Sequence, residues 1–135
     1  MNGQKELKIC RCAVCGNIVL MINDSGVTPV CCGRPMTVLT PNTTDAAFEK
    51  HVPAVTVHGC ETEIRIGNED HPMTNAHFIE WIMLVTECRI YTAYLSPDEE
   101  PAVSFTLGEE ERAALAYAYC NLHGLWLKRL CEDDC

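Results

Sequence analysis

The chain has no long apolar run among its 135 residues. Its richest apolar stretch, Phe78 to Val85, is too short to span a bilayer and contains Glu80. The first residues, Met1 to Lys8, are polar and lack the apolar core of a signal peptide. We therefore expect a soluble, cytoplasmic protein that does not associate with membranes.

Basic residues are also scarce, because 10 Lys and Arg stand against 19 Asp and Glu and give a formal net charge of −9. Nucleic-acid binding needs clustered Lys and Arg, so this balance excludes a nucleic-acid partner. We expect the acidic runs Glu109 to Glu111 and Glu132 to Asp134 to be solvated surface. An acidic surface repels anions, so an anionic substrate would require a local positive feature at its site.

What the chain does have is 10 cysteines. In a reducing cytosol, closely spaced cysteines are more often metal ligands or redox thiols than structural disulfides. Cys12 and Cys15 form a Cys-x-x-Cys pair, and Cys31 and Cys32 are adjacent. A Cys-x-x-Cys turn lets both sulfurs face one ion, which is half of a tetrahedral thiolate site. A structural zinc site and an iron site both fit this spacing.

The chain divides into two segments. Residues 1–38, which hold these cysteine pairs, predict a small strand-and-turn module around a metal, and residues 39–45 predict a linker. Residues 46–135 contain short stretches of two-residue alternation separated by turn signals, a pattern typical of an antiparallel β-sandwich. These stretches are Val55 to Val57, Ile64 to Ile66, Ile90 to Tyr94 and Val103 to Leu107. Residues 114–119 are interpreted as a further strand, although their composition also favours a helix.

The second segment also contains every histidine of the chain. Cys120 and His123 form a Cys-x-x-His chelate, His71 and His77 flank the start of an apolar strand, and His51 lies just before another. The spacing fits a shared metal site, with scattered structural histidines as the alternative. His58 lies outside these groups and is interpreted as a hairpin residue.

The surroundings of these residues resemble a known family. Residues 8–19 and 30–36 resemble the desulforedoxin module, whose iron is held by four cysteines. Residues 49–53, 71–73, 77–82 and 120–124 resemble, in order and spacing, the metal-site segments of superoxide reductases. Nearly the whole chain therefore resembles desulfoferrodoxin, in which a desulforedoxin-like module precedes a neelaredoxin-like domain. The chain departs from the family at Cys10, where an aromatic residue is common, and at residues 74–76, where the family is often more acidic.

The resemblance implies an all-β fold in which a small desulforedoxin-like metal module is followed by an immunoglobulin-like antiparallel β-sandwich. It also implies two non-haem iron ions per chain, and zinc could replace iron in the four-cysteine site of a recombinant sample. The implied ligands of the first ion are Cys12, Cys15, Cys31 and Cys32, and those of the second are His51, His71, His77 and His123 in one plane with Cys120 axial. Five protein ligands leave one position of an octahedral ion open.

The implied function is one-electron reduction of superoxide to hydrogen peroxide at the ferrous four-histidine, one-cysteine centre, with the four-cysteine centre as an accessory electron-transfer site. Lys50 is expected to attract the anion, and Glu49 to occupy the open position in the ferric state. The resemblance further implies a rubredoxin-like electron donor, a homodimer, and an anaerobic or microaerophilic prokaryotic source. The competing hypotheses are an electron-transfer or iron-sensing protein, a structural zinc protein, and a dismutase that releases dioxygen.

The remaining cysteines receive no ligand role. Cys88 is expected to be a buried, small apolar side chain and Cys60 a loop residue. Cys10 is not expected to replace Cys12, because that exchange would break the Cys-x-x-Cys chelate. Cys131 and Cys135 belong to an acidic tail, residues 131–135, that is expected to be mobile.

Overall fold

The computed structural model describes residues 6–43, 48–67 and 70–130. The chain forms two compact units, a small one that ends at Thr40 and a larger one that begins at Pro41. The border between them lies within residues 39–45, the stretch predicted to be a linker. Asn42, just beyond the border, is tied to the larger unit, because its side chain donates to the Leu127 carbonyl and accepts from the Leu127 amide.

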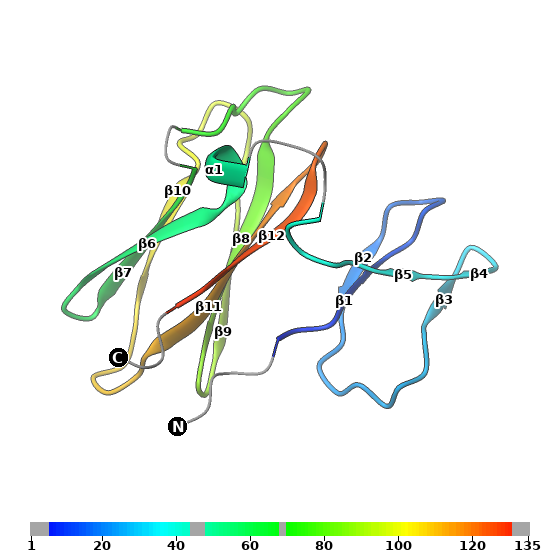
Figure 1. The fold of residues 1–135 in the computed structure, drawn as a ribbon, viewed down its shortest axis with the longest axis horizontal. Coiled ribbons are helices and arrows are strands. Elements are labelled where there is room, and N and C mark those ends of the chain that lie inside the picture. Colours follow the sequence, from blue (N-terminus) through cyan, green and yellow to red (C-terminus); the bar gives the residue numbers. More distant parts are fainter. Residues whose placement is uncertain (1–5, 44–47, 68–69, 131–135) are drawn as a thin grey trace. The chain divides into compact units, whose positions relative to one another are not determined.

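The small unit is built from short antiparallel strands (Figure 1). One sheet has the order β2-β1-β5 and a separate hairpin pairs β3 with β4. Their bounds are β1 (Ile9–Arg11), β2 (Ile18–Leu20), β3 (Val30–Cys31), β4 (Arg34–Pro35) and β5 (Thr37–Val38). Cys10 is fully buried and packs with Cys12 and Met36, so it serves the core of this unit.

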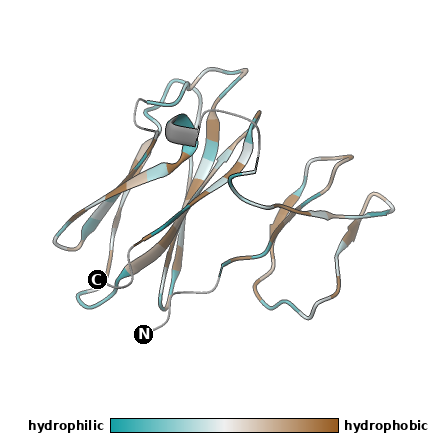
Figure 2. Cartoon of the chain, viewed as in Figure 1, coloured by the Kyte–Doolittle hydropathy of each residue, from teal (hydrophilic) through white to brown (hydrophobic). Residues whose placement is uncertain are grey.

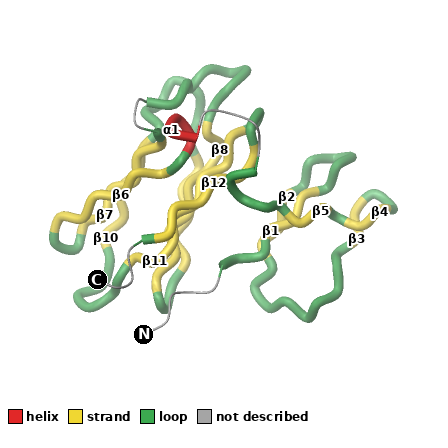
Figure 3. Tube along the Cα trace, viewed as in Figure 1, coloured by secondary structure: helices red, strands yellow, loops and turns green. Residues whose placement is uncertain are grey.

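The larger unit consists of two antiparallel sheets (Figures 1 and 3). The first has the order β10-β7-β6, and the second has the order β12-β11-β8-β9. The strands are β6 (Pro53–His58), β7 (Glu61–Ile66), β8 (Ile79–Thr86), β9 (Ile90–Tyr94), β10 (Ala102–Thr106), β11 (Ala113–Cys120) and β12 (Gly124–Arg129). A single helical turn, α1 (Phe48–His51), precedes β6. The predicted all-β class with an antiparallel sandwich is confirmed, and no helix within the described ranges is long and apolar enough to cross a bilayer.

The core of the larger unit lies between its two sheets and follows the two-residue alternation of the sequence. Ile64 and Ile66 of β7 are fully buried against Ile82 and Leu84 of β8. In Figure 2 hydrophobic and hydrophilic residues alternate along β6, whose inner positions include Val55. Full burial of one such side chain stabilises the fold by about 1.5–3 kcal/mol.

The ambiguous stretch at residues 114–119 is a strand, as predicted, because it forms the centre of β11 between β8 and β12. Cys60 lies exposed in a turn and His58 is exposed at the end of β6, and both predictions are confirmed. The prediction for Cys88 is wrong. Its side chain is exposed, because it lies in the tight turn between β8 and β9. The predicted mobile tail lies outside the described residues.

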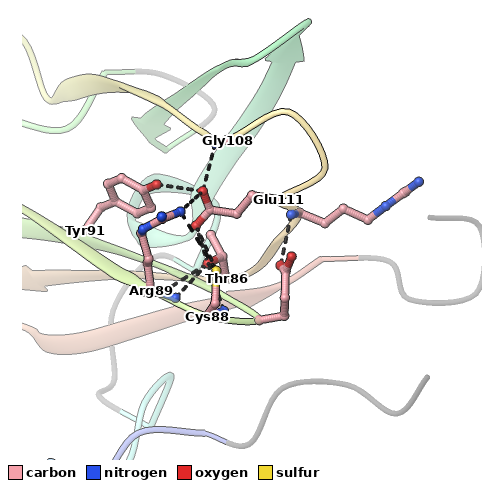
Figure 4. Close-up of polar contacts among 8 residues, drawn as sticks. Thr86, Cys88, Arg89, Tyr91, Gly108 and Glu111 are labelled. Carbon is pink, nitrogen blue, oxygen red and sulfur yellow. Dashed lines mark hydrogen bonds and ion pairs between the residues drawn. The ribbon is translucent and has the colours of Figure 1, made fainter.

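Glu111 is a second correction, since it was expected to be a solvated acidic residue. Its side chain is only 3% exposed. Figure 4 shows its carboxylate surrounded by donors from three segments of the chain. The donors are Thr86 Oγ1 at 2.6 Å, the Gly108 amide at 2.8 Å, the Tyr91 hydroxyl at 2.8 Å and Arg89 Nη1 at 2.9 Å. These contacts, led by the Thr86 hydroxyl, lower the pKa of Glu111 from 4.5 to about 2.

Glu111→Ala is therefore expected to destabilise the larger unit, because it leaves buried donors without their shared acceptor. We expect a fall in Tm of about 10 °C at pH 7, the size of a strongly destabilising change in a domain of this length. The exposed neighbour Glu110 provides the matched control, and Glu110→Ala should leave Tm within about 2 °C.

The same carboxylate predicts a pH dependence. A lowered folded-state pKa contributes stability that is complete above pH 4.5 and is lost as the pH falls toward 2. The Tm difference between the parent and Glu111→Ala should therefore narrow across that window in thermal melts. A difference that stays constant from pH 7 to pH 2 would show that the ionised carboxylate is not the source of the stability.

Candidate metal centres

The first cluster brings together the four cysteines predicted as ligands in the small unit. The Sγ atoms of Cys12, Cys15, Cys31 and Cys32 all lie within 4.8 Å of one another. Cys12 and Cys15 come from the turn between β1 and β2, and the other two come from the hairpin of β3 and β4. Cys15 Sγ and Cys31 Sγ lie 3.6 Å apart.

The backbone of both turns explains how the sulfurs converge. Gly16 has a φ of +83°, and its amide donates to the Cys12 carbonyl at 2.9 Å, which closes the turn around the first pair. Cys32 also has a positive φ, +54°, which is uncommon for a residue with a side chain. The unusual conformation lets two adjacent cysteines face the same point. It therefore accounts for a ligand pair that spacing alone leaves unexplained.

The electrostatics of this cluster fit a bound cation. The backbone amide of Cys15, which donates to Cys12 Sγ at 3.4 Å, is the main cause that lowers the pKa of Cys12 to about 6. The neighbouring sulfurs raise the pKa of Cys31, and they raise that of Cys32 to about 12. Four thiolates at this spacing repel one another, so a soft metal ion is what allows all four to be ionised together.

The second cluster gathers side chains from four separate segments of the larger unit. His51 ends α1, His71 and His77 lie between β7 and β8, and Cys120 ends β11. The nearest ligand atoms of these four residues lie within 4.8 Å of one another. His123, in the turn between β11 and β12, falls outside that group of mutual distances. Its Nδ1 nevertheless lies 3.0 Å from His51 Nε2 and 3.9 Å from Cys120 Sγ.

The four imidazoles form a closed ring around a common centre. Neighbouring ring centroids in the order His51, His71, His77, His123 are separated by 4.7, 4.6, 5.1 and 4.8 Å, the last distance closing the ring. The centroids of His51 and His77, which lie across the ring, are 6.3 Å apart. Adjacent ring planes cross at 74° to 89°. The four ring centroids therefore form a near-square, and Cys120 Sγ lies beside it, 3.9 Å from His123 Nδ1.

Two buried histidine nitrogens without hydrogen-bond partners indicate that these residues fit a metal ion. The Nε2 atoms of His71 and His77 are buried and have no hydrogen-bond partner within the described parts of the chain. His71 Nδ1 donates to the Pro72 carbonyl at 2.7 Å, which fixes the tautomer and leaves Nε2 with a free lone pair. Burial lowers the pKa of His71 to about 4, so the ring is neutral at pH 7. Neutral imidazoles with inward lone pairs fit a transition-metal ion.

Trp126 holds two of these histidines in place. Its ring stacks on His51 at a centroid distance of 4.7 Å with an interplanar angle of 24°. Its Nε1 donates to the His123 carbonyl at 3.1 Å. Trp126 was not predicted as a site residue from the sequence, although its spacing of three from His123 was a signal.

Asn121 links the cysteine turn to the histidine loop. Its Oδ1 accepts from the Phe78 amide at 2.9 Å, and its Nδ2 donates to the Ala76 carbonyl at 3.0 Å. Within that loop the Thr74 hydroxyl and amide bond the backbone of His77. Thr74, in the stretch that departs from the family pattern, therefore supports the loop without contributing a ligand.

Cys120 is fully buried at the end of β11. The pairing of β11 with β8 is irregular between Tyr119 and Cys120, and such irregularities re-aim side chains. Burial raises the pKa of this thiol, an effect that the backbone amides of Leu122 and His123 partly offset. A metal ion favours the thiolate, the soft donor that prefers iron or zinc to hard cations.

The two predicted catalytic residues, Glu49 and Lys50, lie in α1 directly before His51, and the Lys50 side chain is exposed.

Comparison with known proteins gives consistent similarities. The Desulfoferrodoxin family matches residues 43–129, and the family of the desulfoferrodoxin N-terminal domain matches residues 4–39. A desulfoferrodoxin of Syntrophotalea carbinolica is 40% identical over 122 residues, which cover 90% of this chain and 95% of the relative. A desulfoferrodoxin of Clostridium acetobutylicum is 44% identical over 111 residues, 82% of this chain and 86% of the relative.

Solved structures show the same similarity in three dimensions. The superoxide reductase of Treponema pallidum matches with a TM-score of 0.79 and 34% identity, over 93% of this chain and all of that one. A superoxide reductase of Giardia intestinalis, designated 1Fe-SOR, matches 61% of this chain and 97% of its own, with a TM-score of 0.54 and 35% identity. The shorter match omits more than a third of this chain.

Proposed function

The chain belongs to the desulfoferrodoxin family, and we propose that it is a superoxide reductase with two iron centres per chain. In the reaction, one superoxide anion takes up one electron and two protons and leaves as hydrogen peroxide. The observation that carries this proposal is the closed ring of four imidazoles with a buried cysteine beside it. Five protein donors exceed the four of a structural zinc site, and a six-coordinate ion held by them would have room for one further ligand.

We propose that the four histidines of the ring and Cys120 would hold the second iron. Bound ferrous iron would supply the electron for superoxide. The chain's own residues set the conditions for that transfer: the near-perpendicular rings and the stacking of Trp126 on His51 hold the nitrogen donors rigidly in place. The Cys120 thiolate would add an electron-rich sulfur donor to the ligand set, as a cysteine ligand does in haem proteins. The first iron is assigned to Cys12, Cys15, Cys31 and Cys32 and serves as an accessory electron-transfer site.

Lys50 is assigned the capture of the anion. The formal net charge of −9 repels superoxide from the protein as a whole, so a local positive charge must offset it. Lys50 is exposed and directly precedes the buried His51 in the sequence, and this position supports the assignment. Glu49, one position earlier, is assigned to cap the site in the ferric state.

Lys50→Ala is expected to slow the bimolecular reaction with superoxide roughly tenfold, the low end of the range for electrostatic focusing. The visible spectrum of the reduced and oxidised iron should stay unchanged, because no ligand is lost. Pulse radiolysis or stopped-flow mixing with superoxide measures the rate constant. Lys128→Ala removes the same charge from an exposed position on β12 and is the matched control.

The salt dependence of the rate constant shows whether Lys50 attracts superoxide electrostatically or plays no part in its capture. In the parent, added salt should slow the reaction, because it screens charges beyond about 8 to 10 Å at ordinary ionic strength. In Lys50→Ala the dependence should flatten or reverse, since only the acidic surface then acts on the anion. Equal rate constants and equal salt slopes in the two proteins would remove Lys50 from the proposal.

The biological setting is proposed from the family. We infer a rubredoxin-like electron donor, a homodimer, and a cytoplasmic location in an anaerobic or microaerophilic prokaryote. Support comes from the similarity to desulfoferrodoxins along nearly the whole chain. Zinc in the four-cysteine site of a recombinant sample would follow from the similar preference of both metals for tetrahedral thiolates. Size-exclusion chromatography with light scattering and metal analysis of the purified protein test these points.

A further inference from the structure

The two units differ strongly in charge. Between residues 5 and 40 there are four Lys or Arg and two Asp or Glu, a net charge of +2. The remaining residues hold six Lys or Arg and 17 Asp or Glu, a net charge of −11. A ferric ion with four thiolates would add about −1 to the small unit, which leaves it positive. Such an asymmetry along a chain suggests that the basic part meets a partner of opposite charge.

The sulfur cluster lies at the surface of this basic unit. Cys15 and Cys32 are exposed. Each has an exposed valine close by in the sequence: Val14, 58% exposed, directly precedes Cys15, and Val30, 67% exposed, lies two positions before Cys32. We call Val14, Cys15, Val30, Cys32 and Arg34 the collar. Exposed apolar residues beside a redox site exclude water when a second surface covers them, as the core of an interface does.

Two basic side chains lie in or next to the collar. Arg34 is exposed and pairs by register with Cys31, a member of the sulfur cluster. The Arg11 guanidinium lies beside Gly16, since a Cβ on that glycine would be 3.6 Å from Arg11 Nη2. Lys8 is instead engaged with Asp24 at 3.3 Å. The collar therefore combines an apolar centre with cationic groups at its edge, which is the anatomy of an interface for an acidic protein.

We propose that the collar is the docking face for a small acidic one-electron carrier protein. The inference rests on the proposed function for the identity of the metal. The reduced carrier loses one electron and the ferric four-cysteine centre gains it, so no bond is made or broken and no proton is needed. The charge of −11 on the rest of the chain repels the same carrier and directs it to the small unit.

Charge reversal at Arg34 tests the docking face. A reduced, acidic rubredoxin serves as the probe, and stopped-flow absorbance follows reduction of the four-cysteine centre in the full-length iron protein at low salt. Arg34→Glu should lower the second-order rate constant about tenfold, and Arg34→Gln should fall between it and the parent. Lys128→Glu makes the same charge change at an exposed position of the acidic unit and should stay within about twofold. An unchanged spectrum of the centre verifies that each variant is folded.

Affinity provides a readout that is independent of electron transfer. With zinc in place of iron in the full-length chain, NMR titration should show tighter binding of the acidic rubredoxin than of the basic carrier cytochrome c. Val14→Asp should weaken rubredoxin binding by about tenfold, because it places a charge in the apolar centre. Equal effects of Arg34→Glu and Lys128→Glu would overturn the proposal, as would tighter binding of cytochrome c.

Occupation of the collar by a second copy of the chain would also overturn it. That outcome would appear as self-association at low salt that Arg34→Glu abolishes. Failure of the proposed function gives a different result. In that case neither the prereduced parent nor any of these prereduced variants would react with superoxide.

Discussion

Cys120→Ser is expected to lower the rate of reaction with superoxide by more than about a hundredfold, beyond the 10- to 100-fold that is usual for residues that only support a metal ligand. The change replaces a soft thiolate with a hard hydroxyl that stays protonated. It also removes an electron-rich sulfur donor without altering the surface of the protein, since Cys120 is fully buried. The absorption band from thiolate-to-iron charge transfer at the second centre should disappear together with the activity.

The exposed Cys88 supplies the control for that substitution. Cys88→Ser changes the same atom in a turn between β8 and β9, outside both clusters, and should leave both the band and the rate intact. Retention of the charge-transfer band in an iron-loaded Cys120→Ser variant would exclude Cys120 as a metal ligand. The histidine ring would then have to hold the metal without a sulfur donor.

Cys12→Ser is expected to remove the spectrum of the four-cysteine centre while the second centre still reacts with superoxide at the parent rate. Cys12 is the buried sulfur of the first cluster, and its thiolate is favoured by a pKa of about 6. A serine at this position loses the thiolate and one of two ligands of the Cys-x-x-Cys chelate. The second site is unaffected because all of its residues belong to the larger unit.

Steady-state turnover with an added donor extends this prediction. If the first centre passes electrons to the second, the steady-state turnover rate with the acidic carrier should fall in Cys12→Ser. The rate at which superoxide oxidises the prereduced protein once should stay at the parent value. Cys60→Ser, at an exposed turn, should change neither rate. Loss of the superoxide reaction in a folded Cys12→Ser protein with iron in its second site would contradict the independence of the two centres.

The features that could be predicted correctly from the sequence are those that depend on residues close together in the chain. Each of these ligand pairs lies within four consecutive residues, so local backbone geometry alone brings its two donors together. The pairs are Cys12 with Cys15, Cys31 with Cys32, and Cys120 with His123. The alternation at Ile64 and Ile66 indicated an inner face, because side chains alternate across a strand. These features depend on local geometry, which is encoded in neighbouring residues.

Sequence reasoning was least successful where a side chain owes its environment to distant segments. Glu111 was interpreted as solvated, but donors from β9, from the end of β8 and from the preceding loop enclose its carboxylate. Cys88 was placed in the core, but the register of β8 and β9 puts it in their turn. Trp126 was missed because stacking on His51, 75 positions away, follows only from the pairing of β12 with β11.

The histidine ring is expected to hold an iron ion that reduces superoxide, and neither to dismutate superoxide nor to hold a purely structural metal. The most direct measurement combines iron content per chain with rapid mixing of the fully reduced protein and superoxide, with hydrogen peroxide and dioxygen both quantified. We expect two iron ions per chain and one hydrogen peroxide for each superoxide consumed, with oxidation of the second centre and no dioxygen released. Evolution of dioxygen at half the superoxide consumed, or a colourless zinc protein that does not react, would contradict this account.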